Sequence, residues 1–81
     1  MLTVYSTETC GYCRKLKAYL DERGVPYTVV DVAASPSAAQ ALRRVSGQSG
    51  VPVTVADNGA VIVGFDRPRI DALLDEIGAA H

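Results

Sequence analysis

Hydrophobic and polar positions follow two different periods along the first 32 residues. Residues 2–6 (LTVYS) form a short β-rich segment, and residues 27–32 (YTVVDV) form a second segment that is almost continuously apolar. Such a run is typical of a strand covered on both faces, so we expect both segments to be central strands of a sheet. Between them, side chains recur at helical spacing, namely Tyr12, Cys13, Leu16, Tyr19 and Leu20. Gly24, followed by Val-Pro, supplies the stop, and the pattern therefore predicts a βαβ unit.

A second helix and a hairpin are predicted in the middle of the chain. Ser35 or Ser37 can cap a helix that ends near Gly47 and carries a narrow, mostly solvated apolar stripe. The stripe consists of Ala38, Ala41, Leu42 and Val45. Residues 51–65 (VPVTVADNGAVIVGF) then indicate two short antiparallel strands joined at Asn58-Gly59, which is a strong hairpin signal.

The C-terminal segment predicts a last helix. Asp66 can accept the free amides of its first turn, where Pro68 is tolerated. One face of this helix is lined by Ile70, Leu73, Leu74 and Ile77. The predicted order is βαβαββα, an α/β fold in a single domain that spans residues 1–81.

Composition restricts what this domain binds. The chain of 81 residues is 48% hydrophobic and 21% charged, which is ordinary for one compact globular domain. Its net charge of -1, from eight basic and nine acidic residues, gives no basic footprint for nucleic acid or an anionic membrane. We therefore expect partners that are proteins or small molecules, and we expect a monomer.

The compartment affects how the cysteines are interpreted. No apolar run approaches the roughly 20 residues of a membrane-spanning helix, and the N-terminal segment lacks the features of a signal peptide. We therefore expect a cytoplasmic protein, and in reducing surroundings two cysteines suggest redox or metal chemistry. A disulfide between Cys10 and Cys13 would close almost no loop, so it would add little to stability.

Cys10 and Cys13, the only cysteines of the sequence, lie where the first predicted helix begins. At that position, unpaired backbone amides and the positive end of the helix dipole favour the Cys10 thiolate, which is the species that attacks disulfides. Cys13 lies about one turn inward, within reach of Cys10 but shielded, which suits a resolving thiol. Arg14, Lys15 and Lys17 add positive charge, although three basic residues on a helix are most often only a solvated face.

Three motifs in this order resemble the thioredoxin superfamily over essentially the whole chain. They are Cys10-Gly11-Tyr12-Cys13 before the first helix, GVP at residues 50–52 before the third strand, and VGFD at residues 63–66 before the last helix. The small size, the tyrosine in the motif and the absence of Trp are similar to glutaredoxins and their relatives, the NrdH-redoxins and mycoredoxins. The resemblance implies a thioredoxin-like fold with a four-stranded mixed sheet flanked by three helices. It also implies a thiol-disulfide oxidoreductase that works by dithiol exchange.

The same resemblance implies a substrate site around the cysteines. The Val51-Pro52 bond would be cis and would place the Val51 backbone opposite the thiols, where it can pair with a substrate chain in strand fashion. A trans proline that opens a strand is the alternative. The resemblance also assigns Gly64, Phe65 and Asp66, which precede the last helix, to the substrate-binding set.

Three residues next to the cysteines are further candidates for substrate binding. Gly11 would leave the helix start sterically open, and Arg14 would add charge close to Cys10. The Tyr12 ring would offer a surface to the substrate, but half-buried packing of this ring at the helix start is an equally open interpretation.

We infer the expected electron donor from the positions at which this sequence differs from the glutathione-binding pattern of glutaredoxins. Glutaredoxins bind glutathione through a lysine three residues before the first cysteine, polar groups ahead of the cis-proline, and a Gly-Gly turn with an acidic residue. This sequence departs at Thr7 for the lysine, at Gln48 and Ser49 ahead of the proline, and at Val63 for the first glycine. Gly64 and Asp66 match, and GFDRPRI is similar to the Gly-Phe-x-Pro region of NrdH-redoxins, with the proline displaced by one residue. We expect no bound cofactor and electrons from NADPH through thioredoxin reductase, with glutathione or another low-molecular-weight thiol as the alternative.

Two other classes of function stay open. A closed zinc site wants four ligands, which two cysteines and His81, expected to be a frayed terminus, do not supply, so we predict no metal site. Some glutaredoxins have a small residue in place of the proline of the motif and hold an iron–sulfur cluster between two subunits together with glutathione. With Gly11 at this position, the sequence resembles them. A dimeric cluster carrier is therefore the main alternative, which anaerobic reconstitution would reveal by visible absorption. A non-catalytic adaptor is the other class, but it would not need two cysteines at this spacing.

Overall fold

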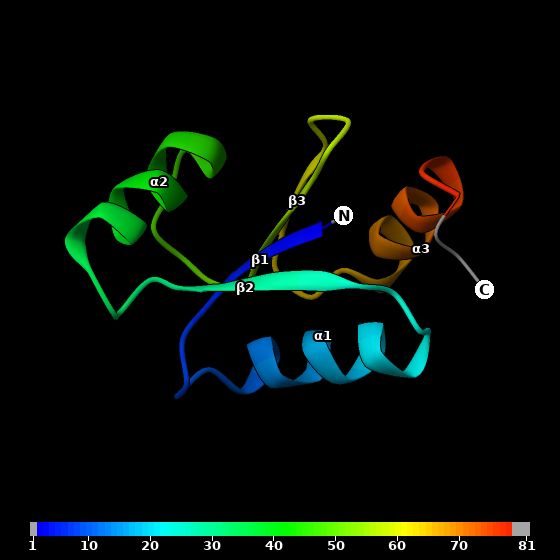
Figure 1. Ribbon diagram of the computed structural model, residues 1–81, viewed down its shortest axis with the longest axis horizontal. Helices are drawn as coiled ribbons and strands as arrows, with labels where there is room; N and C mark the ends of the chain where they lie inside the picture. The colour runs from blue at the N-terminus through cyan, green and yellow to red at the C-terminus, as the bar shows by residue number, and fades with distance from the viewer. Residues whose placement is uncertain (1, 79–81) are drawn as a thin grey trace.

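The computed structural model describes residues 2–78, and within them the chain forms three helices and one four-stranded sheet (Figure 1). In chain order the elements are β1 (Leu2–Ser6), α1 (Gly11–Glu22), β2 (Tyr27–Asp31), α2 (Pro36–Ser46), β3 (Val53–Ala56), β4 (Val61–Val63) and α3 (Arg67–Glu76). The predicted order βαβαββα and the thioredoxin-like fold are confirmed. A helix with the length and apolar character needed to cross a bilayer is absent from residues 2–78.

The sheet combines a βαβ unit with a hairpin. Its strand order is β2-β1-β3-β4. In β1, Val4 lies opposite Val29 of the parallel strand β2 and opposite Thr54 of the antiparallel strand β3. Thr54 in turn lies opposite Ile62 of β4, which is also antiparallel. Strands β1 and β2 are parallel because α1 crosses over between them, whereas the tight Asn58-Gly59 connection forces β3 and β4 to be antiparallel.

The prediction that residues 27–32 form a central strand is wrong, because β2 lies at the edge of the sheet. Thr28 and Val29 of this strand are exposed, and Val29 as a whole residue is 44% accessible. An apolar, β-branched run reports strand propensity, but it does not determine which strands become neighbours. That order depends on the hairpin, which pairs with the free side of β1.

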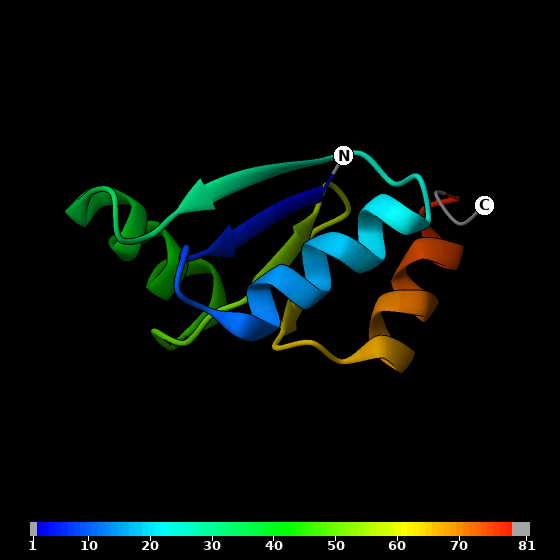
Figure 2. The ribbon, with the colours of Figure 1, turned by 90° about the horizontal axis from the view of Figure 1, so that it is seen from below.

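The hydrophobic core lies between one face of the sheet and helices α1 and α3, which both cover that face (Figure 2). Alternate strand positions point to this face because strand side chains repeat with a period of two. The core consists of Leu2, Val4, Leu16, Leu20, Val25, Ala56, Ile62, Ile70, Leu73 and Leu74. The helical stripes predicted for the first and last helices therefore supply the main apolar contacts that hold both helices on the sheet.

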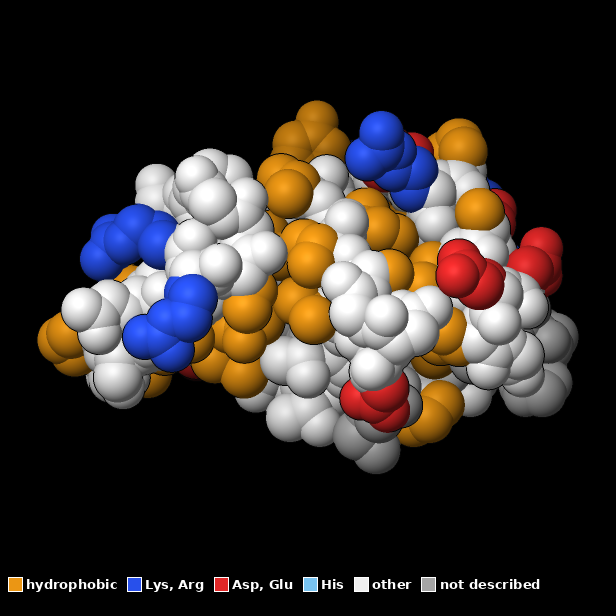
Figure 3. Space-filling model, turned by 90° about the horizontal axis from the view of Figure 1, so that it is seen from above, with side chains coloured by type: hydrophobic (Ala, Val, Ile, Leu, Met, Phe, Trp, Pro, Cys, Tyr) orange, Lys and Arg blue, Asp and Glu red, His pale blue; other side chains and the backbone are white. Residues whose placement is uncertain are grey.

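The other face of the sheet is covered only in part. Helix α2 packs against β3 and β4, and of its predicted stripe only Leu42 is fully buried. Val45 of α2 is 37% exposed, but Ala38 and Ala41 are half-buried, so the stripe is less solvated than predicted. Val61 and Val63 of β4 are also exposed, and hydrophobic side chains gather between α2 on the left and α3 on the right in Figure 3.

All three helices begin at a side chain that accepts backbone hydrogen bonds. Ser35 Oγ accepts the Ala38 amide at 3.2 Å at the start of α2, so Ser35 and not Ser37 is the cap. Asp66 Oδ1 accepts the Arg69 amide at 3.3 Å at the start of α3, as predicted. The corresponding position of α1 is a cysteine, which leads to the candidate site.

Candidate active site

Cys10 is the N-cap residue of α1. Its backbone is extended, with φ -88° and ψ 114°, and its sulfur accepts a hydrogen bond from the Cys13 backbone amide at 3.2 Å. Its carbonyl accepts the Arg14 amide at 3.2 Å, which begins the helical hydrogen-bond ladder. The Cys10 sulfur therefore replaces the capping oxygens found at the other two helices, and it pairs with an amide that the helix leaves free.

The surroundings of the Cys10 sulfur favour its ionised form. Burial raises the pKa of this thiol, but hydrogen bonds with Cys13 and the Tyr12 amide and the charge of Arg14 outweigh it, so the pKa of Cys10 lies below the ordinary value. Of the three basic residues expected to contribute, Arg14 is the one that lowers the pKa of Cys10. The Lys15 ammonium lies over the Tyr12 ring instead, 5.2 Å from its centroid.

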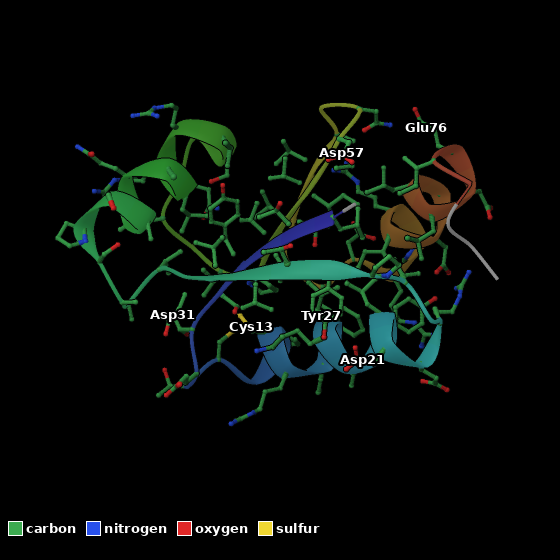
Figure 4. The ribbon with its side chains drawn as sticks, viewed as in Figure 1. Cys13, Asp21, Tyr27, Asp31, Asp57 and Glu76 are labelled. Carbon is green, nitrogen blue, oxygen red and sulfur yellow. The ribbon has the colours of Figure 1, made fainter. Side chains whose placement is uncertain are left out.

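Cys13 has the opposite environment. It is completely buried, on the side of α1 that faces the sheet (Figure 4). Burial raises the pKa of the Cys13 thiol to about 11, with further increases from its hydrogen bond to Cys10 and from the Cys10 charge, while the charge of Lys17 opposes this rise. The thiolate is therefore favoured at Cys10, whereas the buried Cys13 is a protonated thiol at neutral pH.

The Val51-Pro52 bond lies against the cysteine pair and is cis, as the resemblance implied. The Val51 carbonyl oxygen is 3.9 Å from Cys10 Sγ, although the two residues are 41 positions apart in the sequence. It can accept a hydrogen bond from the Cys10 thiol when Cys10 is neutral. The carbonyl oxygen of the next residue, the buried Pro52, accepts a hydrogen bond from the Gly64 amide at 2.8 Å. The second and third sequence motifs are thus hydrogen-bonded together beside the first.

The turn before α3 is only partly available to a ligand. Gly64 adopts φ +83°, a conformation that side chains other than glycine rarely adopt. Phe65 turns toward the core, and its ring meets the Tyr19 ring edge-on, with centroids 6.0 Å apart. Asp66 caps α3 with one carboxylate oxygen and lies 3.5 Å from Arg69 Nε with the other. Gly64 is therefore the residue of this turn that lies directly beside Pro52.

The helix start is open to solvent around Cys10. A Cβ added at Gly11 would have no neighbouring atom within 4 Å, which leaves the access expected for substrates and also required by the iron–sulfur alternative. Tyr12 is 63% exposed, so the half-buried packing considered for it does not occur. Arg14 is exposed as well, and its Nη1 donates to the Glu8 carbonyl oxygen at 3.4 Å.

One cluster behind the site was missed by the sequence patterns. The Tyr19 hydroxyl donates to Asp71 Oδ1 of α3, and Arg23 Nη1 donates to Tyr19 Oη at 2.7 Å and to Asp71 Oδ1 at 3.0 Å. The Arg67 guanidinium lies over the Tyr19 ring, 4.8 Å from its centroid. This cluster joins α1 to α3 and supports Phe65 from behind. The Tyr19 and Arg23 spacing is visible in the sequence, but the Asp71 partner is 48 residues away from Arg23.

Metal ligands do not gather in the described part of the chain. Within residues 2–78, no group of three or more His, Cys, Asp or Glu side chains is arranged to hold a metal ion. His81, the expected frayed terminus, lies outside the described residues.

Comparisons with known proteins agree with this geometry. A family model described as Glutaredoxin matches residues 2–61. The chain is 41% identical over 76 residues to a glutaredoxin-like 8.6 kDa protein of Clostridium pasteurianum, covering 94% of this chain and 100% of that protein. Among solved structures, NrdH-redoxin of Escherichia coli superposes with a TM-score of 0.79 at 30% identity, over 89% of this chain and 92% of that one. A buckwheat glutaredoxin–glutathione complex superposes with a TM-score of 0.77 at 28% identity, over 99% and 81%.

Replacing Arg14 tests the electrostatic part of the site. In Arg14→Gln, loss of the positive charge should disfavour the thiolate and raise the pKa of Cys10, whereas Lys15→Gln should leave it in place because that ammonium lies over Tyr12. The rate of alkylation by iodoacetamide, measured against pH below about 9, reports Cys10 because Cys13 titrates at about 11. Equal shifts in the two variants, or no shift in Arg14→Gln, would contradict the assignment.

Proposed function

Because this chain belongs to the glutaredoxin family of thiol-disulfide oxidoreductases, we propose that it reduces protein disulfides with Cys10 as the attacking thiol and Cys13 as the resolving thiol. We further propose that it works as a monomer in the cytoplasm and takes its electrons from thioredoxin reductase. The observation that carries the proposal is the hydrogen bond between the Cys13 amide and the Cys10 sulfur, since it favours a thiolate at the less buried of the two cysteines.

The reaction transfers two electrons through a mixed disulfide. The Cys10 thiolate attacks one sulfur of the substrate disulfide, a Cys10–substrate bond forms, and the second substrate sulfur leaves as a thiolate that takes up a proton. Cys13 then attacks Cys10 Sγ, which releases the substrate as a second thiol and leaves a disulfide between Cys10 and Cys13. The donor's dithiol returns two electrons and two protons to this bond.

The high pKa of Cys13 is compatible with this second step. Part of the increase comes from its hydrogen bond to Cys10 and from the Cys10 charge. Both contributions depend on a Cys10 thiolate, which no longer exists once Cys10 is joined to a substrate. The pKa of Cys13 then falls toward the value set by burial, by its hydrogen bond with Thr7 and by Lys17, so its thiolate forms more easily in the mixed disulfide than in the free dithiol.

The Val51 backbone is the proposed binding site for the substrate chain. Its carbonyl oxygen lies 3.9 Å from Cys10 Sγ, so an extended chain attached to that sulfur would pass along residue 51. Backbone pairing of this kind reads the shape of an extended peptide and not its side chains. The buried Pro52, hydrogen-bonded to Gly64, supports this backbone, and the exposed Tyr12 ring offers an apolar contact beyond Cys10.

The proposed electron donor is chosen because this chain lacks several of the residues that would bind glutathione. Glutathione carries two carboxylates, and a charge-assisted pair with lysine would be a main source of its affinity. Thr7 occupies that lysine position, and the Gln48 side chain bonds to its own loop. Asp66 is occupied by the α3 cap and by Arg69. NrdH-redoxin, described as having a thioredoxin-like activity profile, is similar over nearly the same length, which also favours thioredoxin reductase as donor.

Substitution of each cysteine tests the division of roles. Cys13→Ser should still attack a disulfide peptide but should stop at a mixed disulfide on Cys10, because the resolving sulfur is absent. Cys10→Ser should lose turnover by roughly 10³-fold or more, since the attacking atom itself is removed. Mass spectrometry after quenching with acid identifies the trapped species. An active Cys10→Ser protein together with an unreactive Cys13→Ser protein would show that the roles are reversed.

Assays with separate donors test the proposed electron source. Oxidised protein should be reduced faster by NADPH with thioredoxin reductase than by glutathione at matched driving force. Thr7→Lys is the matched variant, and it should speed reduction by glutathione about two- to fivefold, the range expected for an exposed charge pair, with no change toward the reductase. Rapid, saturable reduction of the unsubstituted protein by glutathione, without any response to the reductase, would be incompatible with this choice of donor.

A further inference from the structure

The loop that leads into Val51 is held by a side chain. The Gln48 carboxamide folds back on Gly50: its Oε1 accepts the Gly50 amide, and its Nε2 donates to the Gly50 carbonyl oxygen at 3.0 Å. The same Nε2 donates to Ser46 Oγ at 3.2 Å, and Ser46 Oγ lies 2.7 Å from the Leu42 carbonyl oxygen in α2. We call this set, formed by Ser46, Gln48 and Gly50, the Gln48 clamp. It pairs both backbone polar groups of Gly50, as a neighbouring strand would.

Gly50 fits the clamp for a steric reason. A Cβ added at this position would lie 2.6 Å from Gln48 Oε1 and 3.7 Å from Gln48 Cδ, and no other atom would be within 4 Å. Gly50 is not one of the glycines with positive φ, so its backbone conformation suits any residue. A side chain at position 50 would therefore displace the Gln48 carboxamide, which is the flexible end of its side chain, and would open the clamp.

The clamp is placed where it can control the backbone beside Cys10. Val51 follows Gly50 directly, and its carbonyl oxygen faces Cys10 Sγ at 3.9 Å. Before the clamp, the Gly47 amide is anchored to the end of α2, and after it the Pro52 carbonyl is anchored to Gly64. Between these two anchors, within the described residues, the Ser46 and Gln48 side chains hold the main chain up to Gly50, and Val51 itself contacts Cys10 Sγ.

We propose that Gln48 is a positioning residue, which fixes the Val51 backbone in register with Cys10 so that an extended disulfide-containing chain can pair with it. This inference rests on the proposed function, because it assumes that substrates bind along Val51. It also assigns a role to a position that the sequence pattern marked only as a missing cation. The Gln48 carboxamide is hydrogen-bonded to Ser46 and Gly50, so it acts on the substrate only through the position of Val51.

The Gln48 clamp should affect substrate binding without changing the reactivity of the thiol. The groups that lower the pKa of Cys10 are Cys13, Tyr12 and Arg14, which all belong to α1. The clamp lies between α2 and β3 and touches none of them. Loss of the clamp should therefore weaken the pairing of a peptide with Val51 and leave the pH profile of Cys10 alkylation unchanged.

A double-mutant cycle provides the test. Reduced protein reacts with a synthetic peptide disulfide in single-turnover experiments that need no electron donor, and the half-saturating peptide concentration is measured. Gln48→Ala and Gly50→Ala should each raise it about three- to tenfold, as expected for the loss of one aligned hydrogen bond. The double variant should raise it no further, because the Cβ at position 50 then has no partner to displace. Ser49→Ala, at the exposed neighbouring position, is the control and should change nothing.

The outcomes separate this inference from the proposed function. Suppose that the unsubstituted protein reacts with the peptide and that the half-saturating peptide concentrations of both single variants are within twofold of its own. This result would overturn the role of Gln48 alone. Additive effects in the double variant, or a shifted alkylation profile in Gln48→Ala, would also overturn it. If the unsubstituted protein did not react with the peptide at Cys10, the proposed function itself would fail. Melting temperatures of all variants show whether each one is folded.

Discussion

The hydrogen bond from the Cys13 amide to the Cys10 sulfur is the interaction on which the rest of the site depends. It exists because α1 begins at Cys10, so that the helix presents unpaired amides to a sulfur and not to a hydroxyl or carboxylate oxygen. The same helix buries Leu16 and Leu20 against the sheet, which fixes its start relative to the Val51-Pro52 bond. Core packing thereby determines where the Cys10 sulfur lies, and the helix start favours its thiolate form.

The two loops opposite Cys10 are supported from behind. On one side, Tyr19 is held by Arg23 and Asp71 and packs against Phe65, which precedes α3. On the other side, the Gln48 clamp closes on Gly50 immediately before Val51. Thiol exchange needs the attacking and leaving sulfurs aligned, so backbone groups that orient the substrate must not drift. Both supports leave the partly buried Cys10 sulfur next to the exposed residues Gly11 and Tyr12.

The sequence predicted those parts of the fold that depend on local rules. Helical spacing, the Asp66 cap and the Asn58-Gly59 turn each act within a few residues, and the structure has them where they were expected. The position of β2 could not be predicted in this way, because its edge location depends on the pairing of β1 with a hairpin formed 25 or so residues later. The exposure of Tyr12 and the Tyr19, Arg23 and Asp71 contacts depend on tertiary packing for the same reason. Gln48 was noticed only for its lack of charge, since no pattern records that a carboxamide will bond to a backbone two residues away.

The most direct test of this account is an NMR titration of the reduced protein, in which the Cβ chemical shifts of Cys10 and Cys13 are followed separately against pH. If the start of α1 favours the thiolate, the midpoint for Cys10 lies below the ordinary cysteine value of about 8.5, and that for Cys13 lies far above it, near a pKa of about 11. Two midpoints close to the ordinary value, or a lower midpoint for Cys13 than for Cys10, would contradict the claim that the helix start and the burial of the second thiol divide the chemistry between the two sulfurs.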